Sequence, residues 1–212
     1  TPMRPSASDL TDLPVRMRRL PLDDAGRVVP WFATEIDGKH DFRVITPENI
    51  HDAIRMKLCW VCGLTLGSHV TFVAGPMCGV NRTSSEPPSH LDCAVWSATH
   101  CPFLNNPNKE RRDTNLPAEV GMPGIGIMRN PGVTMVWTTR HGWGVRVVPN
   151  GILFGMGDPH RVLWFRDGRP ATRVEVSESI LTGLPELKRL ARTRDDRREL
   201  ARRVRQLRPW LP

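Results

Sequence analysis

Apolar residues in the first half of the chain gather in short runs that predict a hairpin and a helix. Residues 27–36 and 41–45 are rich in β-branched and aromatic side chains, and Asp37-Gly38 between them is a strong signal for a tight turn. Apolar side chains then recur at helical spacing over residues 47–58, directly after Thr46, which is a good helix N-cap. We therefore expect a β-hairpin followed by a helix.

The second half of the chain predicts a sheet and then a helix. Four short runs of mainly β-branched and aromatic residues, separated by turn residues, predict antiparallel strands at 133–139, 145–148, 152–156 and 162–166. Thr172, with Glu175 three residues later, has the capping-box pattern that starts a helix. Gly183 is a typical helix stop, so this helix should cover about 173–181.

The last predicted element is a helical region over residues 186–207. Its apolar side chains recur at helical spacing, so one face would be buried and the arginines would line the other face. Thr193 with Asp196 repeats the capping pattern within this region. A second helix start is therefore expected there.

The elements together predict an α+β protein with four divisions. Prolines among polar residues favour an extended or partly disordered arm at the N-terminus, and a segment rich in Pro, Gly and Asn favours a loop or linker in the middle. The divisions are an arm at 1–25, a first folded part at 26–104, a loop or linker at 105–126, and a sheet with basic C-terminal helices at 127–212. Whether the two folded parts share a core stays open at this point.

The most specific chemical signal is a group of cysteines and a histidine in the first folded part. All five cysteines lie between residues 59 and 101. Cys59 and Cys62 form a C-x-x-C turn followed by glycine, and His90 and Cys93 stand three residues apart, a spacing that places them on one helix face. These four residues predict one structural zinc ion with tetrahedral coordination.

The segment resembles the treble-clef group of zinc folds, in which a knuckle, a hairpin and a helix follow one another. The resemblance covers the residues from Cys59 to Cys101 and includes the predicted strand at 69–74. It implies a central treble-clef module, preceded by the hairpin and helix and followed by the antiparallel sheet with helices. The longer run GPMCGVNRTSSEPPSHLDCA, residues 75–94, is similar to uncharacterised proteins of bacteria and their phages, which implies a relation to phages or mobile elements and no particular activity.

Other ligand sets and other cysteine chemistry were weighed against this zinc site. Cys78, His100 and Cys101 are close in sequence, and Cys101 lies on nearly the same helix face as Cys93, so it could replace His90. An odd number of cysteines argues against a disulfide framework. A thioredoxin-like motif would require the C-x-x-C at the start of a helix, where this chain has glycines.

Charge favours a polyanionic partner. The net charge is +8, and from residue 186 onward ten Lys or Arg stand against four Asp or Glu, which gives +6 in that region. The predicted phosphate contacts are Arg197, Arg198, Arg202 and Arg205. We therefore expect a zinc-containing protein that binds DNA or RNA through its basic C-terminal helix; an acidic protein partner is the alternative for the same helix.

An enzymatic alternative centres on the polar loop before His90. Asn81, Arg82, Ser85 and Glu86 lead toward a helix N-terminus and could form a site for a nucleotide or nucleic acid. HNH nuclease chemistry is disfavoured, because His69 stands at the wrong end of its strand for a general base. Nucleotide-binding glycine loops, the GxSxG motif and the HExxH motif are all missing from the sequence.

The sequence predicts neither a membrane span nor a secretory signal. No run of about 18 apolar residues occurs. We therefore expect no membrane partner and a cytoplasmic location, where cysteines stay reduced and can bind metal. The sequence does not indicate an oligomeric state.

Overall fold

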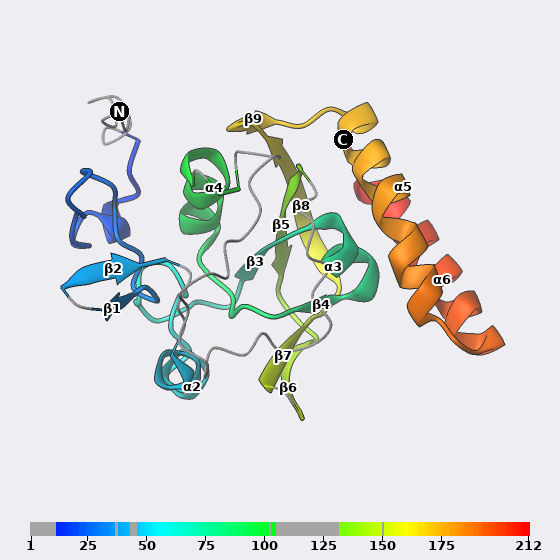
Figure 1. The fold of residues 1–212 in the computed structure, drawn as a ribbon, viewed down its shortest axis with the longest axis horizontal. Coiled ribbons are helices and arrows are strands. Elements are labelled where there is room, and N and C mark those ends of the chain that lie inside the picture. Colours follow the sequence, from blue (N-terminus) through cyan, green and yellow to red (C-terminus); the bar gives the residue numbers. More distant parts are fainter. Residues whose placement is uncertain (1–11, 37, 43–45, 102, 105–131, 150) are drawn as a thin grey trace.

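A four-stranded antiparallel sheet with the strand order β3-β5-β8-β9 lies at the centre of the molecule (Figure 1). A smaller three-stranded sheet has the order β4-β7-β6, and the hairpin β1-β2 forms a third sheet. The strands span Thr34–Ile36 (β1), Lys39–Asp41 (β2), Val70–Ala74 (β3), Thr83–Ser84 (β4), Thr134–Thr139 (β5), Trp143–Val148 (β6), Gly151–Met156 (β7), Pro159–Arg166 (β8) and Arg169–Pro170 (β9). This computed structural model describes residues 12–36, 38–42, 46–101, 103–104, 132–149 and 151–212.

Helices cover the central sheet on both sides. They span Val15–Met17 (η1, a 3-10 turn), Pro47–Arg55 (α2), Pro76–Asn81 (α3), Leu91–His100 (α4), Arg173–Leu190 (α5), Arg194–Leu207 (α6) and Arg208–Trp210 (η2, a 3-10 turn). In Figure 1, α4 lies on the side of the N-terminal segment, and α5 with α6 lies on the opposite side. The described residues form mixed helix and antiparallel sheet, as the predicted α+β class requires.

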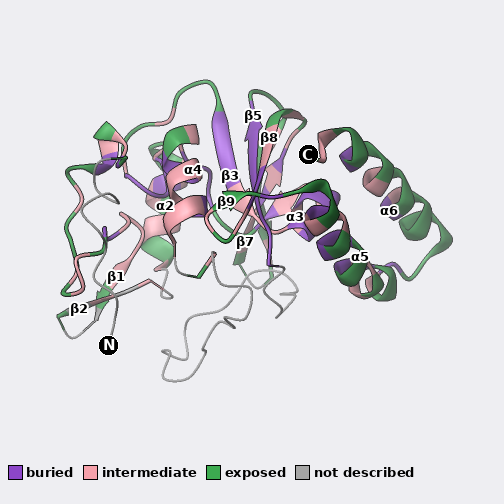
Figure 2. Ribbon diagram, turned by 90° about the horizontal axis from the view of Figure 1, so that it is seen from above, coloured by how far each residue is buried: buried purple, intermediate pink, exposed green. Residues whose placement is uncertain are grey.

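Alternate residues of the central strands face the two helical layers. Phe72, Trp137 and Trp164 belong to a core that also holds buried side chains of α3, α5 and α6. Val136 and Phe165 pack instead with two alanines of α4. Figure 2 shows β3 and β5 buried between these layers. The period of two in a strand thus lets one sheet serve two cores.

The two predicted folded parts share their sheets. Strand β3, from the first part, pairs with β5 of the second over the register Val70↔Thr139 to Ala74↔Met135. Strand β4, also from the first part, pairs with β7. The expected linker at 105–126 lies outside the described residues. The sequence did not decide whether the two folded parts share a core. The strand pairing places residues of both parts in one core.

Both predicted capping boxes are confirmed. In α5 the Thr172 side chain accepts a hydrogen bond from the Glu175 N–H while the Glu175 carboxylate accepts one from the Thr172 N–H, and Thr193 with Asp196 repeats this arrangement in α6. The predicted stop at Gly183 is wrong, because α5 continues to Leu190. Burial explains the difference: a methyl group on Gly183 would lie 2.8 Å from the Met77 side chain, and the following turns of the helix contribute to the core.

The sequence did not predict the short helix α3, and it predicted that α2 extends beyond its observed end. Helix α3 begins at Pro76, where the sequence predicted only the end of a strand; proline at the first helical position is a signal that fits this start. Helix α2 ends at Arg55 rather than near residue 58. The hairpin β1-β2 is confirmed, although its strands are shorter than the predicted runs, and Asp37 and residues 43–45 lie outside the described residues.

Candidate functional site

Four side chains from two separate segments meet in one cluster. The ligand atoms of Cys59, Cys62, His90 and Cys93 all lie within 4.8 Å of one another. Each of the three cysteines has no exposed surface. We call these four residues the cysteine–histidine cluster; among the described residues, no other group of three or more His, Cys, Asp or Glu side chains is close enough to hold a metal ion.

The first two members stand on a tight turn after α2. The N–H of Cys59 donates to the carbonyl of Leu64 at 2.7 Å, and the N–H of Gly63 donates to the carbonyl of Cys59 at 2.8 Å. Gly63 has φ of +68°, the left-handed conformation that glycine adopts without steric strain. The knuckle, residues 59–63, therefore points both thiol groups to the same side.

The other two members come from the start of α4. His90 is the N-cap of this helix and Cys93 lies in its first turn. The backbone before them is fixed at two points. Pro88 accepts a hydrogen bond from the N–H of Trp60 in the knuckle, and Ser89 exchanges two backbone hydrogen bonds with Thr71 of β3, at 2.9 and 2.7 Å. These bonds bring the helix start against the knuckle.

The orientation of His90 suits metal ligation through Nδ1. Its Nδ1 lies 3.4 Å from the sulfur of Cys62, and its Nε2 lies 3.1 Å from the carbonyl oxygen of Thr65. A carbonyl can only accept, so Nε2 carries the proton and donates to Thr65, which leaves the lone pair of Nδ1 directed at the cluster. A histidine metal ligand commonly donates its other N–H to a carbonyl in this way.

The electrostatics of the cluster favour a bound cation. Hydrogen bonds from the Cys62 and Cys93 thiols, from the His90 side chain and from the N–H of Cys62 hold the pKa of Cys59 far below its ordinary value. Hydrogen bonds to the Cys59 and Cys62 sulfurs, and then the charge on those sulfurs, raise the pKa of His90 to about 10 and also raise the pKa of Cys93. A metal ion would displace these protons and neutralise the charge that the sulfurs share.

The N-terminal segment covers the cluster. Leu13, Met17 and Val28 form one buried group with the three cysteines, and Met17 has no exposed surface. Arg19 donates to the carbonyl oxygen of Cys62 at 2.6 Å. For residues 12–25, this differs from the extended or partly disordered arm that the sequence predicted, because these apolar side chains find a surface to bury on; residues 1–11 lie outside the described residues.

The three alternative ligands lie outside the cluster. Cys101 follows the C-terminal end of α4 whereas Cys93 lies at its start, so eight residues of helix separate them by about 12 Å along the axis. His100 stacks on Trp96, with ring centroids 4.7 Å apart. Burial raises the pKa of Cys78 to about 11, which keeps this thiol protonated near neutral pH.

The donor set determines what the cluster can do. Three thiolates and one imidazole can fill all four positions of a tetrahedral ion, as in structural zinc sites, whereas catalytic zinc keeps one position open. Soft thiolate ligands also disfavour magnesium, calcium and manganese. All five cysteines are free of disulfide bonds, so their thiolates can serve as ligands. The arrangement can therefore fix the knuckle to α4.

The loop considered as an enzymatic site is held by local structural bonds. The guanidinium of Arg82 lies over the ring of Trp137, 4.7 Å from its centroid, and donates to the Gly157 carbonyl at 3.1 Å. The carbonyl of Asn81 accepts from Arg203 of α6 at 2.8 Å. Ser85 and Glu86 are exposed. Arg82 thus has a structural role that its sequence context did not indicate, and a catalytic role for these four residues stays a prediction.

The four predicted phosphate contacts differ in their surroundings. Arg197 donates through Nε to the Ala191 carbonyl at the end of α5, so it acts as a helix cap. Arg198 pairs with Asp195, and Arg202 pairs with Glu199 through two hydrogen bonds. Arg205 has no ion pair among the described residues. All four are exposed.

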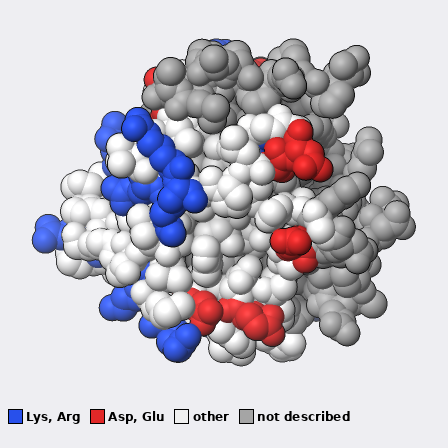
Figure 3. Space-filling model, turned by 90° about the vertical axis from the view of Figure 1, so that its left-hand side faces the viewer, with Lys and Arg blue, Asp and Glu red and all other residues white. Residues whose placement is uncertain are grey.

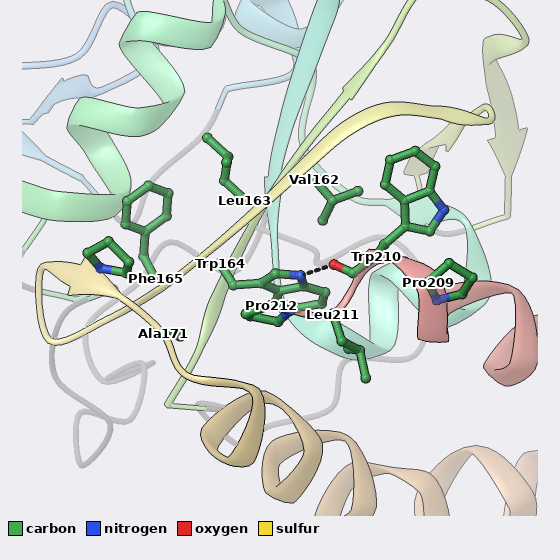
Figure 4. A pocket seen from close by; sticks show the side chains of 10 residues that line it. Val162, Leu163, Trp164, Phe165, Ala171, Pro209, Trp210, Leu211 and Pro212 are labelled. Carbon is green, nitrogen blue, oxygen red and sulfur yellow. Dashed lines mark hydrogen bonds between the residues drawn. The ribbon is translucent and has the colours of Figure 1, made fainter.

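A hollow between β8 and the C-terminal residues is lined by residues with apolar or aromatic side chains. Its volume is about 340 Å³, and the Trp164 indole donates to the Trp210 carbonyl at 2.7 Å beside it (Figure 4). The lining residues are Val162, Leu163, Trp164, Phe165, Pro170, Ala171, Pro209, Trp210, Leu211 and Pro212. None of them is an acid, a base or a nucleophile, so this hollow supplies no catalytic group.

Comparison with known proteins gives no relative to reason from: the chain matches no protein-family model, no curated protein and no solved structure. Among the described residues, no helix is long and apolar enough to cross a membrane.

Replacing a cluster cysteine should remove the metal and loosen the surrounding structure. We expect Cys62→Ser to lower the bound zinc of reduced, tag-free protein from one equivalent to none, because three ligands with a poor fourth hold zinc weakly. Elemental analysis measures the metal, and hydrogen exchange of residues 59–65 measures the loosening. Cys78→Ser is the matched control and should keep full zinc; equal loss in both variants, or no zinc in the wild type, would contradict the site.

Replacing Gly63 should destabilise the protein for two reasons that can be measured separately, its left-handed backbone conformation and its contact with Trp31. A methyl group at Gly63 would lie 2.5 Å from the Trp31 ring, whereas one at Gly38, which has a similar φ of +73°, would meet nothing within 4 Å. Gly38→Ala should cost only the left-handed strain, about 1–2 kcal/mol. Gly63→Ala should cost about 1–3 kcal/mol more, because the indole must move. Urea unfolding of the zinc-loaded variants measures both; equal losses would exclude the contact with Trp31.

Proposed function

We propose that this protein binds nucleic acid through the exposed arginines of α6 and that a structural zinc ion in the cysteine–histidine cluster stabilises the scaffold. The observation that supports the binding surface is a row of four arginines on the solvent side of α6. The observation that supports the metal is the meeting of three thiols and one imidazole within 4.8 Å.

Zinc is the metal that the cluster suits best. Three cysteines and one histidine, all from the protein and all close enough for one ion, are the donors of structural zinc sites. The order of the elements supports a treble clef: the knuckle comes first, β3 then pairs with Ser89, and α4 supplies the last two ligands. The segment 75–87 between these parts holds α3 and β4 and is an addition to that plan.

The arginine row follows from the geometry of α6. Leu200 and Leu207 are buried, and Val204 packs beside them, so this side of the helix faces the core. On the opposite side, residues that differ by three or four positions align. We define the arginine stripe as Arg194, Arg198, Arg202 and Arg205, all of which are exposed. Eleven residues of helix separate its ends by about 17 Å.

This stripe revises the predicted contact set by one residue. Arg197 is engaged at the C-terminal end of α5, and Arg203 caps α3 through the Asn81 carbonyl. Both stand at the edges of the buried face and have structural partners. Arg194 takes the place of Arg197, because it lies on the solvent side at the start of the helix.

The ion pairs within the stripe do not prevent phosphate binding. Arg198 and Arg202 pair with acids three residues earlier, and their side chains are 65% and 53% exposed. Such exposed pairs contribute little, because water screens them and holding two long side chains in one geometry costs entropy. A phosphate can therefore replace the carboxylate at little cost, and the acids would reduce the affinity without abolishing it.

Salt dependence of binding provides the test. The wild type should bind a fluorescent 20-base-pair duplex with an affinity that falls steeply as salt rises, because each phosphate contact contributes a slope of about −0.9. Changing all four arginines of the stripe to glutamine should flatten that slope by up to about 3.6. Fluorescence anisotropy at several salt concentrations gives both slopes, and circular dichroism verifies the fold.

A matched control separates the stripe from net charge. The N-terminal side of the molecule also displays a group of Lys and Arg side chains (Figure 3). Changing Arg18, Arg55, Arg140 and Arg146 to glutamine removes the same charge elsewhere, and these residues are exposed. The control should retain most of the slope. Equal flattening in the two variants, or no binding to DNA or RNA at about 50 mM salt, would refute the proposal; capture of an acidic protein by the same stripe would then be the outcome to pursue.

A further inference from the structure

Two histidines that are far apart in sequence face each other at the end of the central sheet where β3 and β8 begin. His69 directly precedes β3 and His160 lies in β8, and their ring centroids are 5.0 Å apart with an angle of 55° between the rings. Both residues are exposed, so no buried core holds them together. We call these two residues the histidine pair.

A bulge in β8 sets the position of His160. Thr138 pairs with Arg161 and Thr139 pairs with Pro159, which leaves His160 as an extra residue without a partner on β5. Bulges re-aim side chains and are common beside functional sites. Here the bulge coincides with a side chain that meets His69 across the intervening strand β5.

Contacts between two neighbouring turns hold this end of the sheet in place. The Thr139 hydroxyl, in a residue with no exposed surface, lies 2.9 Å from the carbonyl of His141 and 2.7 Å from that of Asp158. Gly157, with φ of +66°, packs so closely on the backbone of Gly142 that a methyl group there would lie 2.8 Å from its carbonyl carbon. The turn after β5 and the turn before β8 are thus fixed to each other, and His160 is fixed with them.

The spacing of the two rings matches that of two imidazoles on one metal ion. A ring nitrogen lies about 2.1 Å from bound zinc, which puts the ring centroid about 3.2 Å from the ion. Two such rings on a tetrahedral ion have centroids about 5 Å apart. The observed 5.0 Å agrees with this value.

The hydroxyl of Ser68 is a hydrogen-bond partner for one ring nitrogen of His69, and a metal ion would bind the other nitrogen. Ser68 Oγ lies 3.3 Å from Nδ1 of His69, so this nitrogen has a hydrogen-bond partner within the protein. A partner on one nitrogen leaves the other for a metal, which is the usual arrangement around histidine ligands. Ser68 would therefore be a positioning residue for His69.

We propose that the histidine pair is a second metal site, which takes a divalent transition-metal ion of the nickel, copper and zinc class, with water in the remaining positions. Imidazole nitrogen is a preferred ligand for this class, while magnesium and calcium prefer oxygen. The site is independent of the cysteine–histidine cluster, with which it shares no residue. Arg161 directly follows His160, and Arg140 directly follows Thr139, the β5 residue that pairs with Val70 and Pro159. Both arginines are exposed, so their charge weakens a cation site and makes this the weaker of the two.

Nickel titration of tag-free protein loaded with one equivalent of zinc tests the proposal. Zinc first fills the thiolate cluster, so that added Ni²⁺ reports on imidazole ligands. One further equivalent should bind, and Ni²⁺ should selectively broaden the imidazole signals of His69 and His160 in NMR spectra. His69→Asn or His160→Asn should weaken nickel binding by at least about tenfold, and Ser68→Ala should weaken it by about tenfold, since even an outer partner of a ligand histidine is worth about 10–100-fold.

The matched control is His51→Asn, which removes an exposed histidine on α2 and should leave nickel binding unchanged. All variants lie on the surface, and their zinc content and circular dichroism establish that they remain folded. The proposal is overturned if nickel does not bind, if it binds equally well to both histidine variants, or if His51→Asn weakens it as much. Broadening of the two signals by inorganic phosphate instead of nickel would assign the pair, with its arginines, to anion binding and would also overturn it.

Discussion

Three consecutive residues, Pro88, Ser89 and His90, hold the cysteine–histidine cluster against the rest of the fold. The carbonyl of Pro88 accepts a hydrogen bond from the knuckle, Ser89 exchanges two bonds with β3, and the N–H of His90 donates to the sulfur of Cys59 at 3.3 Å. The first and last of these residues bond to the knuckle, and the residue between them bonds to β3. Since β3 is also a strand of the central sheet, a shift of this segment would move the knuckle, the sheet and the start of α4 together.

The arginines of the C-terminal region divide into two groups by what they contact. Arg197 and Arg203 donate to backbone carbonyls at the ends of α5 and α3, where the helix dipole is negative and the carbonyls lack helical partners. The four arginines of the stripe contact only nearby acids or nothing among the described residues. A high net charge in one region therefore does not translate directly into binding capacity, because part of it closes helix ends.

Local spacing was enough to predict some features and not others. The four cluster residues and both capping boxes were found from sequence because each depends on residues three apart in the chain. The continuation of α5 past Gly183 depends instead on Met77, which lies more than a hundred positions earlier. Cys101 shows the same limit: it shares a helix face with Cys93, but the rise of the helix, which face periodicity ignores, separates them.

Contacts between residues far apart in the chain could not be predicted from local sequence patterns. The pairing of β3 with β5 depends on a partner more than sixty positions away, and the meeting of His69 with His160 depends on that pairing and on a bulge. The packing of Met17 on the cysteines likewise depends on a surface that exists only after folding. The prolines and charges of that segment predicted exposure, and a few buried apolar side chains decided otherwise.

The cover formed by Leu13, Met17 and Val28 bears on how long a metal ion stays in the protein. A chelator in solution could not reach three sulfurs that have no exposed surface, so an ion held there would leave through an opening of the N-terminal segment or of the half-buried His90 side. The lifetime of such an ion would then depend on this opening equilibrium as well as on the strength of the four ligand bonds. Two sites of identical ligands would exchange metal at different rates if only one carried such a cover.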